Sequence, residues 1–397
     1  MNKEIIPLQF LRGLAASLVL LSHFIDRLVR RNGLTGDEVD RLMPMGHLGV
    51  MMFFAISGFI MVHTTQREFD AREGARQFLV RRFIRIAPLY YATMIAIIAF
   101  RYVTAPYSTN DHFQLPGARD LFNSFFFLPY LNHDNILQPV YGVGWSLNFE
   151  MMFYLVFAAG IGLGRKWGMA AVLSLLCLLC FAGLFIPFPT RDAPQIAAML
   201  YFYTRTDLLF FVSGMVVALL LRRTGTIRTG LNQNLLCLIA GIILCTGLLL
   251  PESWALAAVV IALCVSTLLW RGDEPMSPFS GFARLFGDIS YSMYLTHSFL
   301  LGILALIVVK YVPINAVTLP LSMLCAVMLC FVAGWFSWRV FELPVAAYLR
   351  ARTSPRPLQA APVAHDAPFE FPIIDSLKSQ NMPRIDALDG GINPAQT

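Results

Sequence analysis

The sequence predicts an all-α, polytopic membrane protein of about ten transmembrane helices, with both termini in the cytoplasm. Hydrophobic residues make up 57% of the 397 residues and charged residues only 14%, which is unlike a soluble domain. Hydrophobic stretches recur along most of the chain. Most of them are long runs rather than the ten-residue alternating segments of a β-barrel.

Ten stretches are long and apolar enough to be expected as spans. With the N-terminus inside, the cytoplasmic connections carry 13 Lys and Arg residues and the opposite connections carry 8. The positive-inside rule therefore favours this orientation, although four arginines close to the first outer connection run against it. An even number of spans returns the C-terminus to the cytoplasm. The expected spans are residues 8–29, 47–65, 84–103, 144–163, 167–187, 197–221, 234–250, 253–270, 285–309 and 317–341.

Two further segments stand out from the spans. The longest connection, 104–143, contains an apolar block at 121–131 that is too short to cross a bilayer. A connection of this length is more often functional than idle. We expect residues 1–350 to form one transmembrane domain and residues 351–397, which are polar and proline-rich, to form a disordered cytoplasmic tail.

Charge and cysteine usage exclude several other classes of protein. The formal net charge is +6, but the basic residues cluster between hydrophobic segments, so they indicate topology rather than nucleic-acid binding. All seven cysteines fall inside expected spans, which argues against a disulfide framework or a zinc site. We expect no metal. Arg12 interrupts the first apolar stretch and no small-residue cleavage site follows, so the start of the chain is not a signal peptide.

The first span carries two polar groups whose spacing places them on one face of a helix. Arg12 and His23 are eleven residues apart, so they lie on one helix face with roughly 16 Å between them along the axis. A lipid-facing arginine would be costly, so this face is expected to line a polar interior. Alternatively, Arg12 snorkels to the headgroups and His23 sits in the opposite interface.

Other ionisable residues are expected at a similar depth. By helix rise, His23, Glu150, His297, Arg205 and Asp207 all fall in the middle-to-outer part of the membrane. Groups so placed pair with one another or line a water-filled cavity. Glu150 has no nearby cation in sequence, so it is a candidate to orient an imidazole. Arg205 and Asp207 could instead neutralise each other or a neighbour, and His297 could be a structural polar contact.

The opposite side of the membrane has a cluster of arginines. Arg81, Arg82 and Arg85 gather at the cytoplasmic mouth of the third span, and Arg12 lies about a turn inside the first. Such a cluster is often a positive-inside anchor. Arginine also binds phosphate through two parallel hydrogen bonds, so four arginines around one opening would attract an anion.

Five motifs in order resemble the acyltransferase-3 family of integral membrane acyltransferases. The resemblance covers roughly residues 5–345, is closest to exopolysaccharide O-acetyltransferases of bacteria, and is specific because the motifs occur together. The motifs are Arg12 and His23 with ten residues between them, Arg82-x-x-Arg85, GHLGVMMFFAISGFI in the second span, WSLNFE at 145–150 and DISYSMYLTH at 288–297.

This resemblance implies a membrane O-acyltransferase that uses cytoplasmic acetyl-CoA as acyl donor. Within the family's pattern, His23 matches the catalytic histidine and Arg12 its paired arginine. Arg82 and Arg85 match the pair that engages the donor, and Glu150 matches the acid of the WSL-x-x-E segment. We expect His23 to act as general base on a sugar hydroxyl, with Glu150 orienting its ring. An acyl-histidine intermediate is the competing mechanism.

The resemblance also implies the partners and location of the protein. The acceptor is expected to be an exopolysaccharide or its lipid-linked precursor, with polysaccharide synthesis machinery as a further partner and the bacterial cytoplasmic membrane as the location. Trp145, His297, Arg205 and Asp207 are our candidates for binding the substrate. The alternatives are a proton-coupled transporter or flippase, a longer or succinyl donor, a lipid or small-molecule acceptor, and a non-enzymatic scaffold. The absence of a sequence repeat argues against a transporter.

Overall fold

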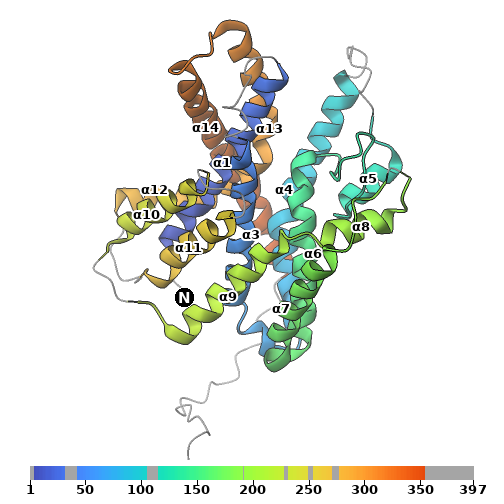
Figure 1. Ribbon diagram of the computed structural model, residues 1–397, viewed down its shortest axis with the longest axis vertical. Coiled ribbons are helices and arrows are strands. Elements are labelled where there is room, and N and C mark those ends of the chain that lie inside the picture. The colour runs from blue at the N-terminus through green and yellow to red at the C-terminus, as the bar shows by residue number, and fades with distance from the viewer. Residues whose placement is uncertain are drawn as a thin grey trace, which may run out of the picture. The chain divides into compact units, whose positions relative to one another are not determined.

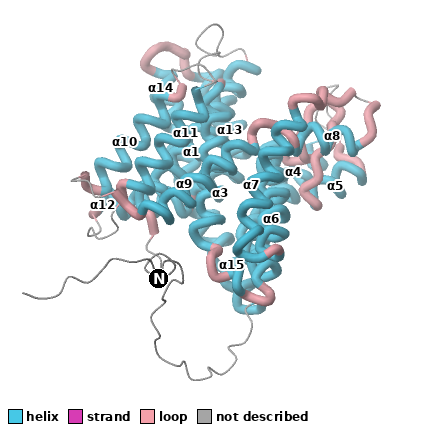
Figure 2. The backbone as a smooth tube through the Cα atoms, turned by 60° about the horizontal axis from the view of Figure 1, so that its bottom comes forward, coloured by secondary structure: helices cyan, strands magenta, loops and turns pink. Residues whose placement is uncertain are grey.

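The computed structural model describes residues 4–31, 43–104, 115–190, 192–227, 231–248, 254–270 and 277–353. These residues form a bundle of helices, without any strand in the described segments (Figure 1 and Figure 2). The expected all-α membrane fold is therefore confirmed. The predicted tail lies outside the described residues except for its first three positions, which continue a helix that ends at Thr353.

The described helices include one short π-helix, named η5. In order along the chain, the described helices are α1 (Ile6–Arg30), α3 (Pro44–Thr64), η1 (Glu68–Asp70), α4 (Gly74–Thr104), α5 (Ala118–Phe125), η3 (Gly142–Gly144), α6 (Trp145–Gly162), α7 (Gly164–Gly183), α8 (Gln195–Tyr203), α9 (Leu208–Thr224), α10 (Gln233–Thr246), α11 (Ala255–Leu268), α12 (Pro278–Asp288), α13 (Ser290–Tyr311), α14 (Thr318–Ser337), η5 (Trp338–Glu342) and α15 (Leu343–Thr353).

Each expected span corresponds to helical structure, but not every helix is long enough to cross alone. Within the described residues, seven helical segments have the length and hydropathy of membrane spans. α10 and α11 are apolar but have only 14 residues each. At 1.5 Å per residue each is about 21 Å long, which is shorter than an apolar core of about 30 Å.

Two expected spans have the wrong boundaries. The range 197–221 is not one regular helix, because α8 ends at Tyr203 and α9 begins only at Leu208. The range 285–309 also begins too early, because residues up to Asp288 belong to α12. α12 is a separate amphipathic helix whose start is fixed by Ser277, which accepts a hydrogen bond from the Ser280 amide. Both errors arise because hydropathy does not register local caps and breaks.

α1 lies at the centre of the bundle. It packs against α3, α10, α12 and α13 (Figure 1). Leu11, Phe24 and Leu28 are completely buried, so several helices surround α1 over most of its length. Arg12 of α1 therefore faces the protein interior rather than lipid, where it lines a pocket between helices.

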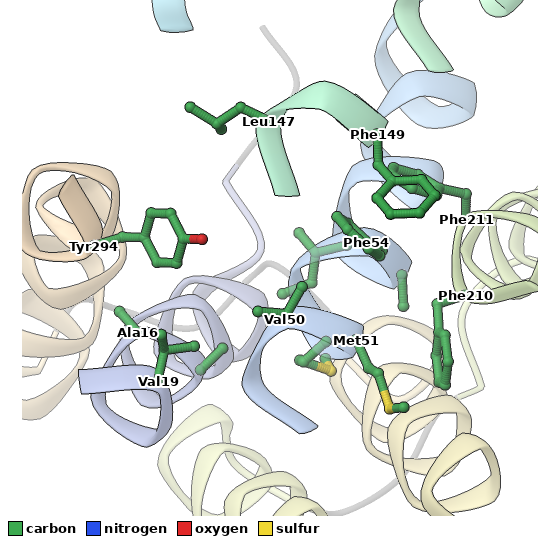
Figure 3. Packing of buried hydrophobic residues seen from close by; sticks show 14 of the residues in the cluster. Ala16, Val19, Val50, Met51, Phe54, Leu147, Phe149, Phe210, Phe211 and Tyr294 are labelled. Carbon is green, nitrogen blue, oxygen red and sulfur yellow. The ribbon is translucent and has the colours of Figure 1, made fainter. Parts of the chain in front are cut away.

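The closest helix pair is α3 and α9, where small residues let the backbones approach. A Cβ atom at Gly214 would lie 1.9 Å from the Ala55 carbonyl oxygen, and one at Gly58 would lie 2.1 Å from that of Phe211. Small residues at such a crossing maximise van der Waals contact between membrane helices. Beside it, the Phe54 and Phe211 rings stack with centroids 4.5 Å apart (Figure 3).

The described part of the long connection, 115–144, folds back onto α4. The Tyr90 hydroxyl donates to the Ser124 carbonyl oxygen at 3.2 Å, and Tyr91 donates to that of Phe125 at 2.8 Å. The Val140 amide in turn donates to the Ser124 hydroxyl at 2.9 Å. These contacts fix the segment that enters α6 and thereby position Trp145 and Glu150.

Candidate active site

A narrow inner pocket lies near the start of α1. Its walls carry Arg12 of α1, Arg82 and Arg85 of α4, and Glu150 of α6, and its volume is about 70 Å³. The Arg82 guanidinium lies over the Tyr154 ring, 5.9 Å from the centroid. The structure therefore brings together three of the four arginines that the sequence singled out. Arg81 does not line this pocket and instead forms an ion pair with Glu68 at 2.5 Å.

Carboxylates balance this arginine cluster. Arg12 and Arg85 lie close enough to Glu342 and Asp288 to interact electrostatically, and Glu150 also faces Arg12. Glu342 ends the π-helix η5 and accepts a hydrogen bond from the Ser292 hydroxyl at 2.6 Å. Glu342 was not among the residues predicted from the sequence. A glutamate in an apolar stretch that ends in Leu343 and Pro344 nevertheless indicates a buried polar contact or a functional site.

A larger outer cavity lies near the end of α1. Its volume is about 640 Å³, and its lining includes His23, Arg27, Tyr141 and Trp145. The Tyr141 hydroxyl donates a hydrogen bond to the Leu295 carbonyl oxygen. Burial raises the pKa of Tyr141, so this hydroxyl stays protonated and keeps the wall of the cavity attached to α13.

His23 meets a second histidine at this cavity. The rings of His23 and His297 stack with centroids 5.1 Å apart. The Nδ1 atom of His297 lies 2.6 Å from the Tyr294 carbonyl oxygen. Because a carbonyl only accepts, Nδ1 carries the proton and Nε2 has its lone pair available. His297 is completely buried, and its Nε2 atom has no hydrogen-bond partner among the described residues.

Tyr294 contacts residues of both cavities. Figure 3 shows the Tyr294 ring projecting from its helix into the space bordered by Leu147, Ala16 and Val50. The Tyr294 hydroxyl donates to the Val143 carbonyl oxygen at 2.6 Å and lies 2.7 Å from the Ser146 hydroxyl. Tyr294 and Ser146 line the inner pocket, whereas Val143 lines the outer cavity. Its hydroxyl therefore joins the walls of both.

Glu150 does not stand beside His23 as the sequence predicted. Glu150 lines the inner pocket, where it accepts hydrogen bonds from the Ser57 hydroxyl at 3.3 Å and from the Tyr154 hydroxyl. The side chain that contacts the His23 ring is that of His297. Five residues separate Trp145, at the outer cavity, from Glu150. That distance turns a helix by about 140° and advances it by about 7.5 Å, which the estimate of depth alone could not resolve.

Arg205 and Asp207 also lie apart from both cavities. Asp207 is buried and accepts from Arg205 Nε at 2.8 Å, and it lies 3.1 Å from Nε2 of His47 on α3. This network closes the break between α8 and α9 and ties it to α3. The alternative in which the two residues neutralise each other or a neighbour is the one that the geometry supports.

Several lining residues were missed or left unassigned in the sequence. Arg27 follows His23 by four residues and therefore shares its helix face, yet it was counted only as an orientation signal. Tyr294 lies inside the DISYSMYLTH motif without an assigned role. Among the described residues, no group of three or more His, Cys, Asp or Glu side chains is arranged to hold a metal ion.

Comparison with known proteins adds an independent finding. A family model described as an acyltransferase domain matches residues 6–339. The exopolysaccharide production protein ExoZ of Rhizobium meliloti is 30% identical over 316 residues, which cover 78% of this chain and 92% of ExoZ.

Two other relatives are more distant. Acyltransferase MdmB of Streptomyces mycarofaciens is 26% identical over 72% of this chain and 76% of its own length. Peptidoglycan O-acetyltransferase OatA of Listeria monocytogenes is 28% identical over 31% of this chain and 21% of its own length. No solved structure matches the chain.

Proposed function

Because this chain belongs to the acyltransferase-3 family, we propose that it transfers an acetyl group from cytoplasmic acetyl-CoA to a sugar hydroxyl of an exopolysaccharide or its precursor. Family membership confirms the resemblance that the motifs carry and identifies a membrane acyltransferase rather than a transporter. The names of ExoZ and OatA support a carbohydrate acceptor. The bacterial cytoplasmic membrane is the location we propose.

The observation that carries this proposal is the division of polar groups along α1. Arg12 lines the inner pocket with Arg82 and Arg85, whereas His23 lines the outer cavity. The two residues are roughly 16 Å apart along one helix. With the N-terminus in the cytoplasm, this arrangement supports a donor entering from inside and an acceptor arriving from outside.

On the donor side, the arginines fit the phosphates of acetyl-CoA. Guanidinium groups bind phosphate bidentately, and Arg82, Arg85 and Arg12 approach one pocket from two helices. The volume of about 70 Å³ accommodates a few water molecules but not a pantetheine arm. Donor entry therefore requires side chains to move, and Tyr294 is the side chain standing between this pocket and His23.

At the outer cavity, His23 would serve as general base. Its imidazole takes the proton of the acceptor hydroxyl while that oxygen attacks the thioester carbonyl carbon. The carbon–sulfur bond then breaks, and the proton on His23 passes to the departing thiolate of coenzyme A. His297 holds the face of the His23 ring by stacking, which takes over the orienting role first expected of Glu150. In the alternative, His23 itself attacks and carries the acetyl group.

Substitution of His23 tests the assignment. We expect His23→Asn to lower acetyl transfer at least a hundredfold, because general-base catalysis contributes about 10²–10⁴-fold. Transfer is measured with radiolabelled acetyl-CoA in proteoliposomes, together with mass spectrometry of the polysaccharide. A labelled protein formed without acceptor would identify the acyl-histidine route.

An exposed histidine provides the matched control. His133 lies in the connection before α6, is exposed, and lines neither cavity. His133→Asn should therefore retain wild-type transfer. Near-normal activity of a correctly inserted His23→Asn variant would overturn the catalytic assignment.

A further inference from the structure

Arg27 lies one helical turn from the proposed general base. It follows His23 by four residues on α1, and both side chains line the outer cavity. Side chains of a helix lean toward its N-terminus, so the Arg27 side chain extends back over the turn that carries His23. The two groups are close enough to interact electrostatically. A permanent positive charge therefore stands beside the imidazole that is expected to accept the proton.

Within the described part of the chain, this guanidinium is not held by an acidic partner. The neighbouring carboxylate, that of Asp26, instead accepts hydrogen bonds from Arg30 Nε at 2.8 and 3.0 Å. The Nε atom of Arg27 is shielded from solvent and has no hydrogen-bond partner among the described residues. A buried donor without a partner costs free energy, so its presence indicates a ligand or a functional role. Arg27 therefore remains available to an anion that forms in the cavity.

α13 leaves room for the guanidinium beside the stacked histidine rings. A Cβ atom at Gly302 would lie 3.4 Å from the Nη1 atom of Arg27, so the guanidinium packs over a glycine. Gly302 follows His297 by five residues, about 7.5 Å further along α13, and Arg27 lies about 6 Å beyond His23 on α1. The guanidinium thus lies about one turn beyond the two rings, on the side from which the acceptor is proposed to arrive.

Acetyl transfer creates a transient negative charge next to His23, and the inference drawn from this rests on the proposed function. When the acceptor oxygen bonds to the thioester carbonyl carbon and its proton passes to His23, the carbonyl oxygen becomes an oxyanion. The oxyanion returns to a carbonyl when the carbon–sulfur bond breaks and the proton on His23 passes to the thiolate of coenzyme A. A fixed hydrogen-bond donor aimed at that oxygen lowers the barrier to both steps.

We propose that Arg27 is a further catalytic residue, whose guanidinium donates a hydrogen bond to this oxyanion. With coenzyme A extending from the inner pocket, the thioester sulfur lies on the inner side of the acyl carbon, so the carbonyl oxygen can point outward to Arg27. Two other polar residues of the cavity fit the role less well. The Tyr141 hydroxyl already donates to the Leu295 carbonyl oxygen, and Arg31 lies eight residues from His23, about 12 Å along the helix axis.

Hydrolysis of acetyl-CoA without any sugar tests this role apart from acceptor binding, because water then takes the place of the sugar hydroxyl. We expect Arg27→Gln to lower the rate at saturating acetyl-CoA about 10²–10³-fold, as the loss of one oxyanion donor does in other enzymes, with KM changed by less than about threefold. Arg30→Gln is the matched control, since it removes a charge from the same end of α1 but outside the cavity lining. Equal rates in the two variants would overturn the proposal.

Replacement of one atom in the donor tests the contact directly. The probe is the dithioester of coenzyme A in which sulfur replaces the acetyl carbonyl oxygen, compared with acetyl-CoA after correction for their rates with hydroxide in solution. Because sulfur is a weak hydrogen-bond acceptor, the wild-type protein should prefer the oxygen donor at least about tenfold, and Arg27→Gln should lose this preference. A purely structural role would lower both rates and leave the preference unchanged, which would contradict the proposal.

Two further comparisons keep the outcomes distinct. Arg27→Lys retains the positive charge and should keep both the wild-type Tm in detergent and part of the preference for oxygen, so the test does not depend on the folding of Arg27→Gln. Wild-type protein that neither hydrolyses acetyl-CoA nor transfers label from it would refute the proposed donor, and the role of Arg27 with it. Wild-type turnover with the same donor preference in wild type and Arg27→Gln would refute the oxyanion contact alone.

Discussion

At the scale of single residues, the hydroxyl of Tyr294 links the walls of the two cavities. It contacts Val143 and Ser146 at once, so the walls of the inner pocket and the outer cavity are joined by one side chain. An acyl donor that reaches His23 must displace this ring or its two hydrogen bonds. On the proposed function, we predict that Tyr294 acts as a latch between the donor side and the acceptor side.

Removal of the hydroxyl alone tests this latch. We expect Tyr294→Phe to raise hydrolysis of acetyl-CoA in the absence of acceptor by roughly five- to 150-fold, because two hydrogen bonds of about 0.5–1.5 kcal/mol each no longer hold the passage shut. Release of free coenzyme A from proteoliposomes measures the effect. The control is Tyr203→Phe, which removes a hydroxyl bonded to the Phe127 carbonyl oxygen outside both cavities. Equal behaviour of the two variants would refute the latch.

Single residues also mark the limit of what sequence reasoning could reach. The spacing of Arg12 and His23 correctly predicted one polar face on α1, since helix geometry is regular over eleven residues. The partner of His23 was not predictable in the same way, because it depends on how α6 and α13 rotate about their own axes. In the structure His297, and not Glu150, contacts the His23 ring.

At the scale of helices, the crossing of α3 and α9 depends on two glycines. We expect Gly214→Ala to lower stability by about 1–3 kcal/mol, since the added Cβ would meet the backbone of Ala55 at 1.9 Å and the helices must separate. Thermal unfolding in detergent measures the change as a fall in Tm.

A glycine without neighbours provides the comparison. Gly281 of α12 is exposed, and a Cβ there would meet nothing within 4 Å. Because alanine favours helix by about 1 kcal/mol relative to glycine, Gly281→Ala should leave Tm unchanged or slightly higher. A similar loss of stability in both variants would contradict the explanation by close packing, because helix propensity alone favours alanine at both positions.

Helix existence was easier to predict than helix boundaries. The apolar runs were long enough to indicate the membrane-spanning helices, because a membrane requires continuous hydrophobicity, but they did not separate α8 from α9 or α12 from α13. The break at Thr204–Asp207 depends instead on the contacts of Asp207 with Arg205 and His47. Contacts between residues 160 positions apart leave no local pattern in the sequence.

At the scale of the whole molecule, both cavities lie within the membrane bundle. Among the residues that the structure describes, their lining lies between Arg12 and Leu306. We therefore expect a chain shortened after Thr353 to insert normally and to transfer acetyl groups at a rate within about twofold of the full chain. The same proteoliposome assay checks this, normalised to the amount of protein in the membrane. Loss of transfer at normal protein levels would assign the last 44 residues a role in the reaction.

The position of Arg12 and His23 on one continuous helix has a consequence for donor choice. One helix carries both residues. The distance between the arginines proposed to bind coenzyme A and the acyl carbon next to His23 is therefore fixed by the protein and cannot adapt to a different acyl carrier. Donors with acyl groups of different size differ only beyond the thioester carbonyl, in the part that would lie in the larger outer cavity. On the proposed function, we expect discrimination between acetyl and succinyl donors to depend on the walls of the outer cavity beyond His23 and not on the arginines of the inner pocket.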